Sequence, residues 1–218
     1  MAPVWLSLQV AVTATLFSGV AGVALAGLLS TRRVPLKGLI DGLFTTPLVF
    51  PPTVLGYYLL VALGRHSAVG QAWEAVFGAP LVFTKSGAVV AAVVTSFPFV
   101  LQGARAALEA VDPSLLDAAR TLGASPVRAF TRVALPLASR GIVAGLVLGF
   151  ARSLGDFGLT LMVAGNIPGE TQTAALAIYD AMLAGRDGDA RALVLTMTGF
   201  ALALMVAAQM LARRPHAR

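Results

Sequence analysis

Long runs of apolar residues, separated by short polar segments, dominate the pattern along this chain. About 20 apolar residues in a helix cross the roughly 30 Å hydrocarbon core of a bilayer. Backbone polar groups inside that core need internal partners, so these runs are expected to be helices. The pattern predicts spans at residues 4–30, 39–63, 87–108, 138–165 and 192–212. Residues 173–183 are too few to span, and we expect a re-entrant or surface helix there.

Composition supports a membrane protein. Of the 218 residues, 57% are hydrophobic and only 12% are charged, whereas soluble domains carry about 25% charged residues. The net charge of +6 is a possible sign of nucleic-acid binding, but the basic residues form short clusters between apolar runs, so no nucleic-acid partner is predicted. No cysteine is present, which excludes disulfides and thiol chemistry, and no metal site is predicted. We therefore predict an all-α integral membrane protein, residues 1–218 forming one domain of five or six transmembrane helices.

The first apolar run has an alternative interpretation as a signal peptide. Ala24-Leu25-Ala26 resembles a signal-peptidase site. However, no basic residue precedes the run, which is also longer than a normal apolar signal core. A first transmembrane helix is the favoured interpretation.

Lysine and arginine predict the orientation, because they are enriched in cytoplasmic loops. One set of loops holds ten basic residues: Arg32, Arg33, Lys37, Arg120, Arg128, Arg132, Arg140, Arg213, Arg214 and Arg218. The opposite loops hold four: Arg65, Lys85, Arg186 and Arg191. This difference places the first set in the cytoplasm. The N-terminus is then outside, and the C-terminus is cytoplasmic.

A polar, basic segment at about residues 109–136 separates the third and fourth spans. Asp112-Pro113 reads as a helix N-cap followed by proline at the first helical position. Gly123 can take the left-handed conformation that ends a helix. Ser125-Pro126 repeats the start pattern, and Pro136 leads into the next span. The segment is therefore predicted to be two short helices with a bend at Gly123.

Two functions suit this segment. It is either an amphipathic element on the membrane surface or a coupling element that docks a soluble partner, since a short rigid helix anchored at both ends transmits a push. The chain contains no Gly-x4-Gly-Lys-Ser/Thr phosphate-binding loop. The chain is therefore not expected to hydrolyse ATP itself, and the energy for any ATP-driven transport must come from another subunit.

The second span is interrupted by prolines, which break helical hydrogen bonding. Freed carbonyl groups at membrane depth need protein, hydroxyl or water partners. The segment is either a structural kink or a distorted helix that lines a transport pathway, and Ser96 on the third span is expected to face it. The candidate pathway residues here are Thr45, Thr46, Pro47, Pro51, Pro52 and Thr53.

The fourth span carries charges, at Arg152 and Asp156. Charges in a span usually face a bundle interior or water. The two residues are four apart, so they share one face and are expected to pair. They form either a structural ion pair or a pathway site in which Arg152 attracts an oxyanion. Gly155 and Gly158 complete this candidate segment.

The polar segment resembles the signature loop of ABC-importer permeases. The resemblance rests on Asp117-Ala118-Ala119, then Gly123, and, after nine intervening residues, Val133-Ala134-Leu135-Pro136. The family usually has glutamate where Asp117 stands. The resemblance implies that Gly123 allows the bend and that Ala118 and Ala119 permit close approach to an ATP-binding subunit. The coupling residues it implies are Asp117, Ala118, Ala119, Gly123, Ser125, Pro126, Leu135 and Pro136.

Further segments are similar to molybdate-importer permeases: residues 46–58, 151–158, 161–169 and 171–173. The resemblance implies a bacterial inner-membrane assembly of two permease copies, two ATP-binding subunits and an external substrate-binding protein. ATP and Mg would be bound by the partner subunit and no cofactor by this chain, which is itself not an enzyme. Tungstate is an alternative substrate, and sulfate and thiosulfate permeases share related segments. An ion-coupled secondary transporter and a non-transporting scaffold are remote alternatives.

Overall fold

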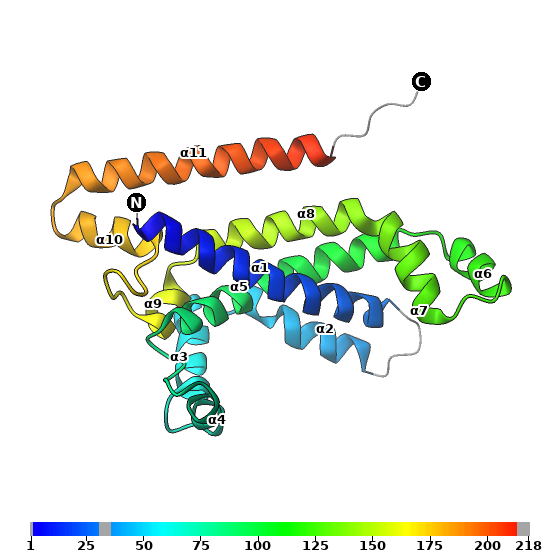
Figure 1. Ribbon diagram of the computed structural model, residues 1–218, viewed down its shortest axis with the longest axis horizontal. Helices are drawn as coiled ribbons and strands as arrows, with labels where there is room; N and C mark the ends of the chain where they lie inside the picture. The colour runs from blue at the N-terminus through cyan, green and yellow to red at the C-terminus, as the bar shows by residue number, and fades with distance from the viewer. Residues whose placement is uncertain (1, 31–35, 213–218) are drawn as a thin grey trace.

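The computed structural model describes residues 2–30 and 36–212, and Figure 1 shows their arrangement. The basic residues 32, 33, 213, 214 and 218 lie outside the described residues. The described part of the chain is helical, with turns and loops between its elements. In chain order these are α1 (Ala2–Leu29), α2 (Lys37–Thr45), η1 (Thr46–Leu48), α3 (Pro52–Leu63), α4 (Ala68–Phe77), α5 (Lys85–Glu109), α6 (Pro113–Thr121), α7 (Pro126–Ala129), η2 (Phe130–Ala134), α8 (Leu135–Leu154), α9 (Gly158–Ala164), α10 (Ala174–Leu183) and α11 (Asp187–Ala212).

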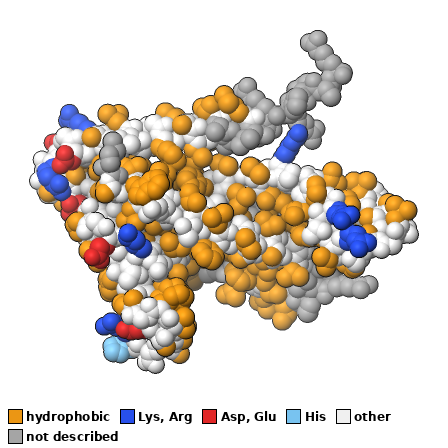
Figure 2. Space-filling view, viewed as in Figure 1, with side chains coloured by type: hydrophobic (Ala, Val, Ile, Leu, Met, Phe, Trp, Pro, Cys, Tyr) orange, Lys and Arg blue, Asp and Glu red, His pale blue; other side chains and the backbone are white. Residues whose placement is uncertain are grey.

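Four helices of the described residues are long and apolar enough to cross a membrane: α1, α5, α11 and the continuous stretch Pro126–Leu154. A fifth span is counted if α2–η1 and α3 form one broken span. In Figure 1, α1, α5, α8 and α11 run roughly along the long axis. Figure 2 shows most charged side chains toward the ends of this axis and hydrophobic surface between them. The predicted all-helical polytopic membrane fold is confirmed, and α10 is the predicted short helix.

The core lies where α1, α5 and α8 pack together. The buried residues Leu29, Leu101 and Ile142 come from these three helices in turn. Gly103 of α5 faces Gly145 of α8 so closely that a Cβ atom on Gly103 would lie 2.7 Å from the Cα atom of Gly145. Small residues permit this approach of two membrane helices.

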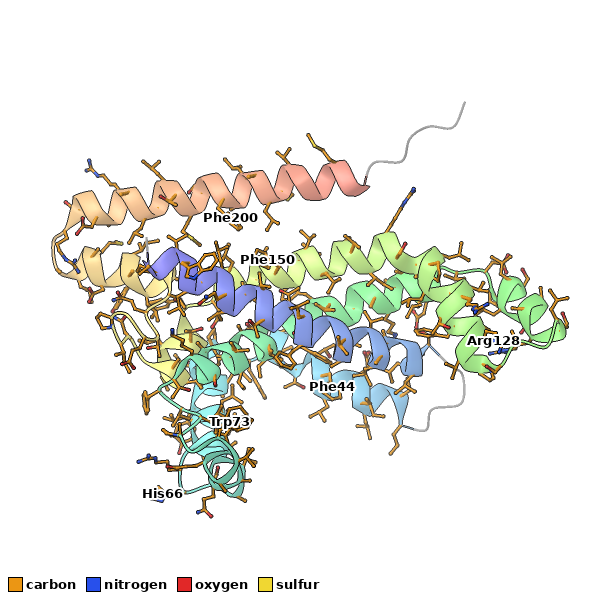
Figure 3. The ribbon with its side chains drawn as sticks, viewed as in Figure 1. Phe44, His66, Trp73, Arg128, Phe150 and Phe200 are labelled. Atoms are coloured by element: carbon orange, nitrogen blue, oxygen red, sulfur yellow. The ribbon has the colours of Figure 1, made fainter. Side chains whose placement is uncertain are left out.

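The last helix is only loosely attached to this core. Most side chains along α11 are exposed over the described residues, and the helix lies along the top of Figure 1. Phe200 of α11 contacts Phe150 of α8, with ring centroids 6.3 Å apart (Figure 3). Much of this apolar helix is therefore left to lipid or to another chain.

The second predicted span is two helices rather than one. The pair Lys37–Leu48 and Pro52–Leu63 is bent by 111°. Pro51 is extended, with φ −55° and ψ 139°, and it restricts the preceding Phe50 to non-helical conformations. Pro51 and Pro52 both lack the N–H group that a continuing helix needs. Two adjacent prolines thus produce a corner, which is more than the expected kink.

The prediction of a separate second helix in the polar segment is wrong. The stretch from Pro126 to Leu154 is one helix, which includes the π-helical turn η2. The N–H of Leu135 donates to the carbonyl of Phe130, five residues back. This shift accommodates Pro136, which has no N–H and whose ring would otherwise meet a carbonyl four residues earlier. The membrane helix therefore begins before Pro136.

Candidate functional site

Helix α6 projects at one end of the molecule, at the right of Figure 1. The side chain of Asp112 accepts a hydrogen bond from the backbone N–H of Ser114 at 2.9 Å, and Pro113 begins the helix. This capping bond holds the pKa of the Asp112 carboxyl below its ordinary value, because the N–H group stabilises the charged form. The predicted helix start is confirmed.

Gly123 ends α6 in the predicted left-handed conformation, with φ +83°. The N–H of Gly123 donates to the carbonyl of Arg120 at 2.9 Å, and the N–H of Ala124 donates to that of Ala119 at 3.0 Å. These two bonds form a Schellman motif, which satisfies the last carbonyls of a helix. A Cβ atom at Gly123 would meet nothing within 4 Å, so the backbone conformation, and not space, favours glycine here.

The surface of α6 is accessible to a partner. Leu122 is 88% exposed, and Asp117 and Ala118 are exposed while Ala119 is half-buried. Asp117 pairs with Arg120 of the same helix at 3.4 Å. Arg128 of α7 lies at the same end of the molecule (Figure 3). Projection, exposed leucine and small residues suit a helix that docks in a groove.

Four coupling candidates lie outside α6. Ser125 caps the second helix, since its hydroxyl accepts from the N–H of Arg128 at 3.3 Å, and Pro126 follows as the first helical residue. Leu135 and Pro136 lie at the start of α8. They therefore lie within the continuous helix Pro126–Leu154 and not on the projecting α6.

The fourth predicted span ends at Leu154 and does not continue to residue 165. Gly155 caps α8, and a new helix, α9, begins at Gly158. The carboxylate of Asp156 lies in the break and accepts from both the N–H of Thr160, at 3.0 Å, and its hydroxyl, at 2.7 Å. Asp156 therefore stops the first helix from continuing by capping the next one.

The predicted pair of Arg152 and Asp156 is present. Arg152 Nη1 lies 3.2 Å from Asp156 Oδ1. The Asp156 side chain is 2% exposed and that of Arg152 is 33% exposed. With its carboxylate fully engaged by three donors, Asp156 has the geometry of a structural ion pair.

The two helix breaks contact each other. A Cβ atom on Gly158 would lie 3.0 Å from the Cβ atom of Pro52, and one on Gly56 would lie 2.7 Å from that of Met162. Helix α3 therefore packs on α9, beginning at Pro52 where the broken span turns. The structure thus joins the proline-rich segment and the segment around Asp156, which are about 100 residues apart in sequence, into one site.

The remaining pathway candidates have different surroundings. The hydroxyls of Thr45 and Thr46 donate to backbone carbonyls one turn earlier, Asp41 at 2.8 Å and Gly42 at 2.6 Å. Pro47 is half-buried, and Pro51, Pro52 and Thr53 are exposed. Ser96 is fully buried, and its hydroxyl lies 3.0 Å from that of Ser18 on α1. The hydroxyl of Ser96 is thus directed at α1 instead of the broken span.

Sequence reasoning missed two polar arrangements. The loop after α9 is held by Gln172, which donates to Asn166 at 3.0 Å, and by the buried Thr171, which accepts from the N–H of Ile167 at 3.1 Å. Ser7 of α1 accepts from the N–H of Ala174 at 2.8 Å and so caps α10 from a distant part of the chain. The resemblance marked residues 161–169 and 171–173 without predicting these bonds, and only its polarity within an apolar run marked Ser7.

A third missed arrangement is a group of four charges that joins α2 to α5. Arg105 contacts Asp41 at 2.7 Å and Glu109 at 2.8 Å, and Lys37 contacts Glu109 at 3.5 Å. Asp41 and Arg105 fall inside predicted spans, where a charge indicates a partner or a function. The presence of these two charged residues within apolar runs was the sequence feature that could have indicated the group.

Comparisons with known proteins agree with this architecture. Residues 18–216 match the family model described as "Binding-protein-dependent transport system inner membrane component". The molybdenum transport system permease protein ModB of Escherichia coli K12 is 44% identical over 205 residues, covering 93% of this chain and 90% of that protein. The sulfate transport system permease protein CysT of the same strain is 37% identical, covering 79% of this chain and 61% of that protein.

A solved structure of the MetNI methionine ABC transporter has the same fold. It superposes with a TM-score of 0.75 at 19% identity and covers 97% of this chain and 93% of that chain. The chain therefore belongs to the family of binding-protein-dependent transport system inner membrane components. It is a multi-pass inner-membrane permease, and permeases of this family work in membrane complexes with ATP-binding and substrate-binding partners.

Proposed function

We propose that this chain is the transmembrane subunit of an ATP-driven molybdate importer. The observation that carries the proposal is the projecting, doubly capped helix α6 in a chain 44% identical to a molybdenum permease over 93% of its length. Tungstate resembles molybdate in size and charge and is an alternative substrate. Sulfate is the second candidate, supported by the 37% identity to CysT.

Two copies of the chain form the pathway with two ATP-binding subunits and an external substrate-binding protein. The exposed apolar surface of α11 and of the α3–α4 arm suits a second copy and lipid. The basic residues Lys37, Arg120, Arg128 and Arg132 lie near the α6 end, which is cytoplasmic in this proposal, with the N-terminus outside. ATP and Mg are held by the partner, which carries the ATPase activity, and this chain needs no cofactor.

In this proposal, α6 occupies a groove of the ATP-binding subunit. The coupling residues are Asp117, Ala118, Ala119, Gly123, Ser125, Pro126, Leu135 and Pro136. When the nucleotide subunits close, both α6 helices approach each other and the membrane helices follow. The two contacting breaks then change angle, because helix corners absorb such changes more easily than packed helices do.

The pathway in this proposal follows the broken segments. Thr45, Thr46, Pro47, Pro51, Pro52 and Thr53 supply hydroxyls and non-helical backbone, and Gly155, Asp156 and Gly158 form the second corner. Arg152, one-third exposed, adds a positive charge beside an anion. The buried Ser96 connects α5 to α1 through Ser18 and makes no contact with the substrate. Weak binding in the pathway lets the anion leave.

Uptake into proteoliposomes tests the proposal. The vesicles hold this chain with its cognate ATP-binding subunit, the binding protein is outside and ATP is inside. We expect uptake of labelled molybdate that needs ATP and that excess sulfate does not suppress, with tungstate as a competitor. Sulfate uptake instead would keep the ABC permease and contradict the molybdate assignment. Uptake without the ATPase, driven by an ion gradient, would contradict the whole proposal.

A further inference from the structure

Helix α2 is weakly seated on the bundle. None of its nine residues is buried. Among the described residues, Ile40 packs at the edge of the core, and the ring centroid of Phe44 (labelled in Figure 3) lies 5.2 Å from that of Phe97 on α5. Burial of apolar surface is the usual force that fixes a helix. Some other interaction must therefore define the position of α2.

The group of four charges supplies that interaction. Arg105 uses two different nitrogens, Nη1 toward Asp41 on α2 and Nε toward Glu109 on its own helix. Lys37 of α2 reaches back to Glu109 at 3.5 Å. The Arg105 and Asp41 side chains are only 26% and 31% exposed. Two contacts thus cross between the helices, and Arg105 is the central member of the group.

The group of four charges lies between the end of α5 and α2, next to the segment that leads into α6. Glu109 is the last residue of α5, and Asp112, which caps the coupling helix α6, follows three residues later. Asp41 lies one turn before Thr45, and its backbone carbonyl accepts the hydroxyl of Thr45. The charges therefore join the base of the coupling loop to the first half of the broken span.

We propose that Arg105 is a positioning residue that transmits movement of the coupling loop to α2. The inference rests on the proposed function, because it assigns a step within the same transport cycle. When α6 is pulled by its partner, the end of α5 moves, and the guanidinium carries α2 with it. Arginine suits this task because its planar fork holds two carboxylates in fixed directions, whereas lysine offers a point charge on a flexible stem.

The test measures anions taken up per ATP hydrolysed by the complete complex in proteoliposomes. Arg105→Gln and Asp41→Asn are each expected to lower this ratio about two- to fivefold, the factor that one partly exposed ion pair supports. The double variant should be no worse than Arg105→Gln alone, since that variant already removes the contact with Asp41. Arg105→Lys should give an intermediate ratio, and Lys37→Gln a smaller loss in the same direction.

The matched control is the ion pair of Arg65 and Glu74 on the α3–α4 arm, at 3.0 Å. Arg65→Gln and Glu74→Gln should leave the ratio unchanged. If uptake and ATP hydrolysis fall in parallel in the Arg105 variants, or if the double variant is additive, Arg105 is only a structural residue and the inference is wrong. If the unaltered complex shows no ATP-driven uptake, the proposed function fails instead, so the two failures are distinguished.

Discussion

Asp156 offers the sharpest test of how the fourth span is built. Its carboxylate accepts three hydrogen bonds, one from Arg152 and two from Thr160, and its side chain is only 2% exposed. Removing one partner of a buried ion pair costs about 3–5 kcal/mol. Arg152 is 33% exposed and can be rehydrated, so we reduce the expected cost of Asp156→Ala to about 2–4 kcal/mol.

The thermal midpoint converts this cost into an observable. A loss of 1 kcal/mol lowers the midpoint by about 2–4 °C in a chain of this length, so Asp156→Ala should lower it by about 4–16 °C. The assay follows the helical circular dichroism signal of the detergent-solubilised chain. Asp156→Asn keeps an acceptor for Thr160 but loses the charge and the bond from Arg152, so it should cost about half as much, or about 1–2 kcal/mol.

The control is Asp189→Ala, because the Asp189 side chain is 66% exposed and lies 3.5 Å from Arg186. Exposed pairs contribute little, and its midpoint should stay within about 2 °C of the parent. An Asp156→Ala chain as stable as the parent would refute the capping argument. A stable Asp156→Asn chain that assembles but no longer transports would show instead that the carboxylate acts in the pathway.

Three further predictions follow from the geometry. Gly123→Val should weaken binding of the ATP-binding subunit about tenfold, measured by titration, because a side chain in the left-handed conformation costs about 1–2 kcal/mol; Gly185→Val, at φ +67° on the opposite side, is the control. Gly103→Val should destabilise the chain by about 1–3 kcal/mol in thermal unfolding, since its Cβ atom meets backbone, whereas Gly199→Ala meets nothing within 4 Å and should change little. The pKa of Asp112 is lowered in the folded chain, so its cap is present above the unfolded pKa and is lost only as pH falls through the folded value. Hydrogen exchange at Ser114, corrected for the intrinsic rate, should therefore be constant from pH 5 to 8, increase only below about pH 4, and lose this pH dependence in Asp112→Ala.

Residues whose structure is decided locally were predictable from sequence. Asp112-Pro113 and Gly123 define the ends of α6 through bonds within a few residues of each other, and span length follows from apolar run length alone. The pair of Arg152 and Asp156 was likewise predictable from spacing. Its surroundings were not, because the helix break and the bonds from Thr160 appear only when α9 is placed.

The errors share one physical cause, which is that an apolar run does not reveal where a helix stops. Residues 138–165 are apolar throughout most of their length, yet Asp156 caps a new helix within them. For the polar segment the prediction was wrong in the opposite way, because it began the helix too late. A π turn before Pro136 lets the membrane helix begin as early as Pro126. The bonds of the Asp156 carboxylate accompany the first of these differences and the shifted backbone bond of Leu135 the second, and hydropathy carries no information about either.

The contact between the two breaks shows why both occur in one chain. A side chain at Gly158 would crowd the Cβ atom of Pro52 at 3.0 Å, and one at Gly56 would lie 2.7 Å from the Cβ atom of Met162, so that something would have to shift. Each corner is bent by its own residues, and the small residues at these positions let the two corners pack closely. A change of angle at the prolines cannot leave α9 in place, and α9 is capped by the carboxylate that also holds Arg152. The geometry thus packs the two interrupted spans against each other, and the Arg105 contacts link α2, the first half of the broken span, to the end of α5.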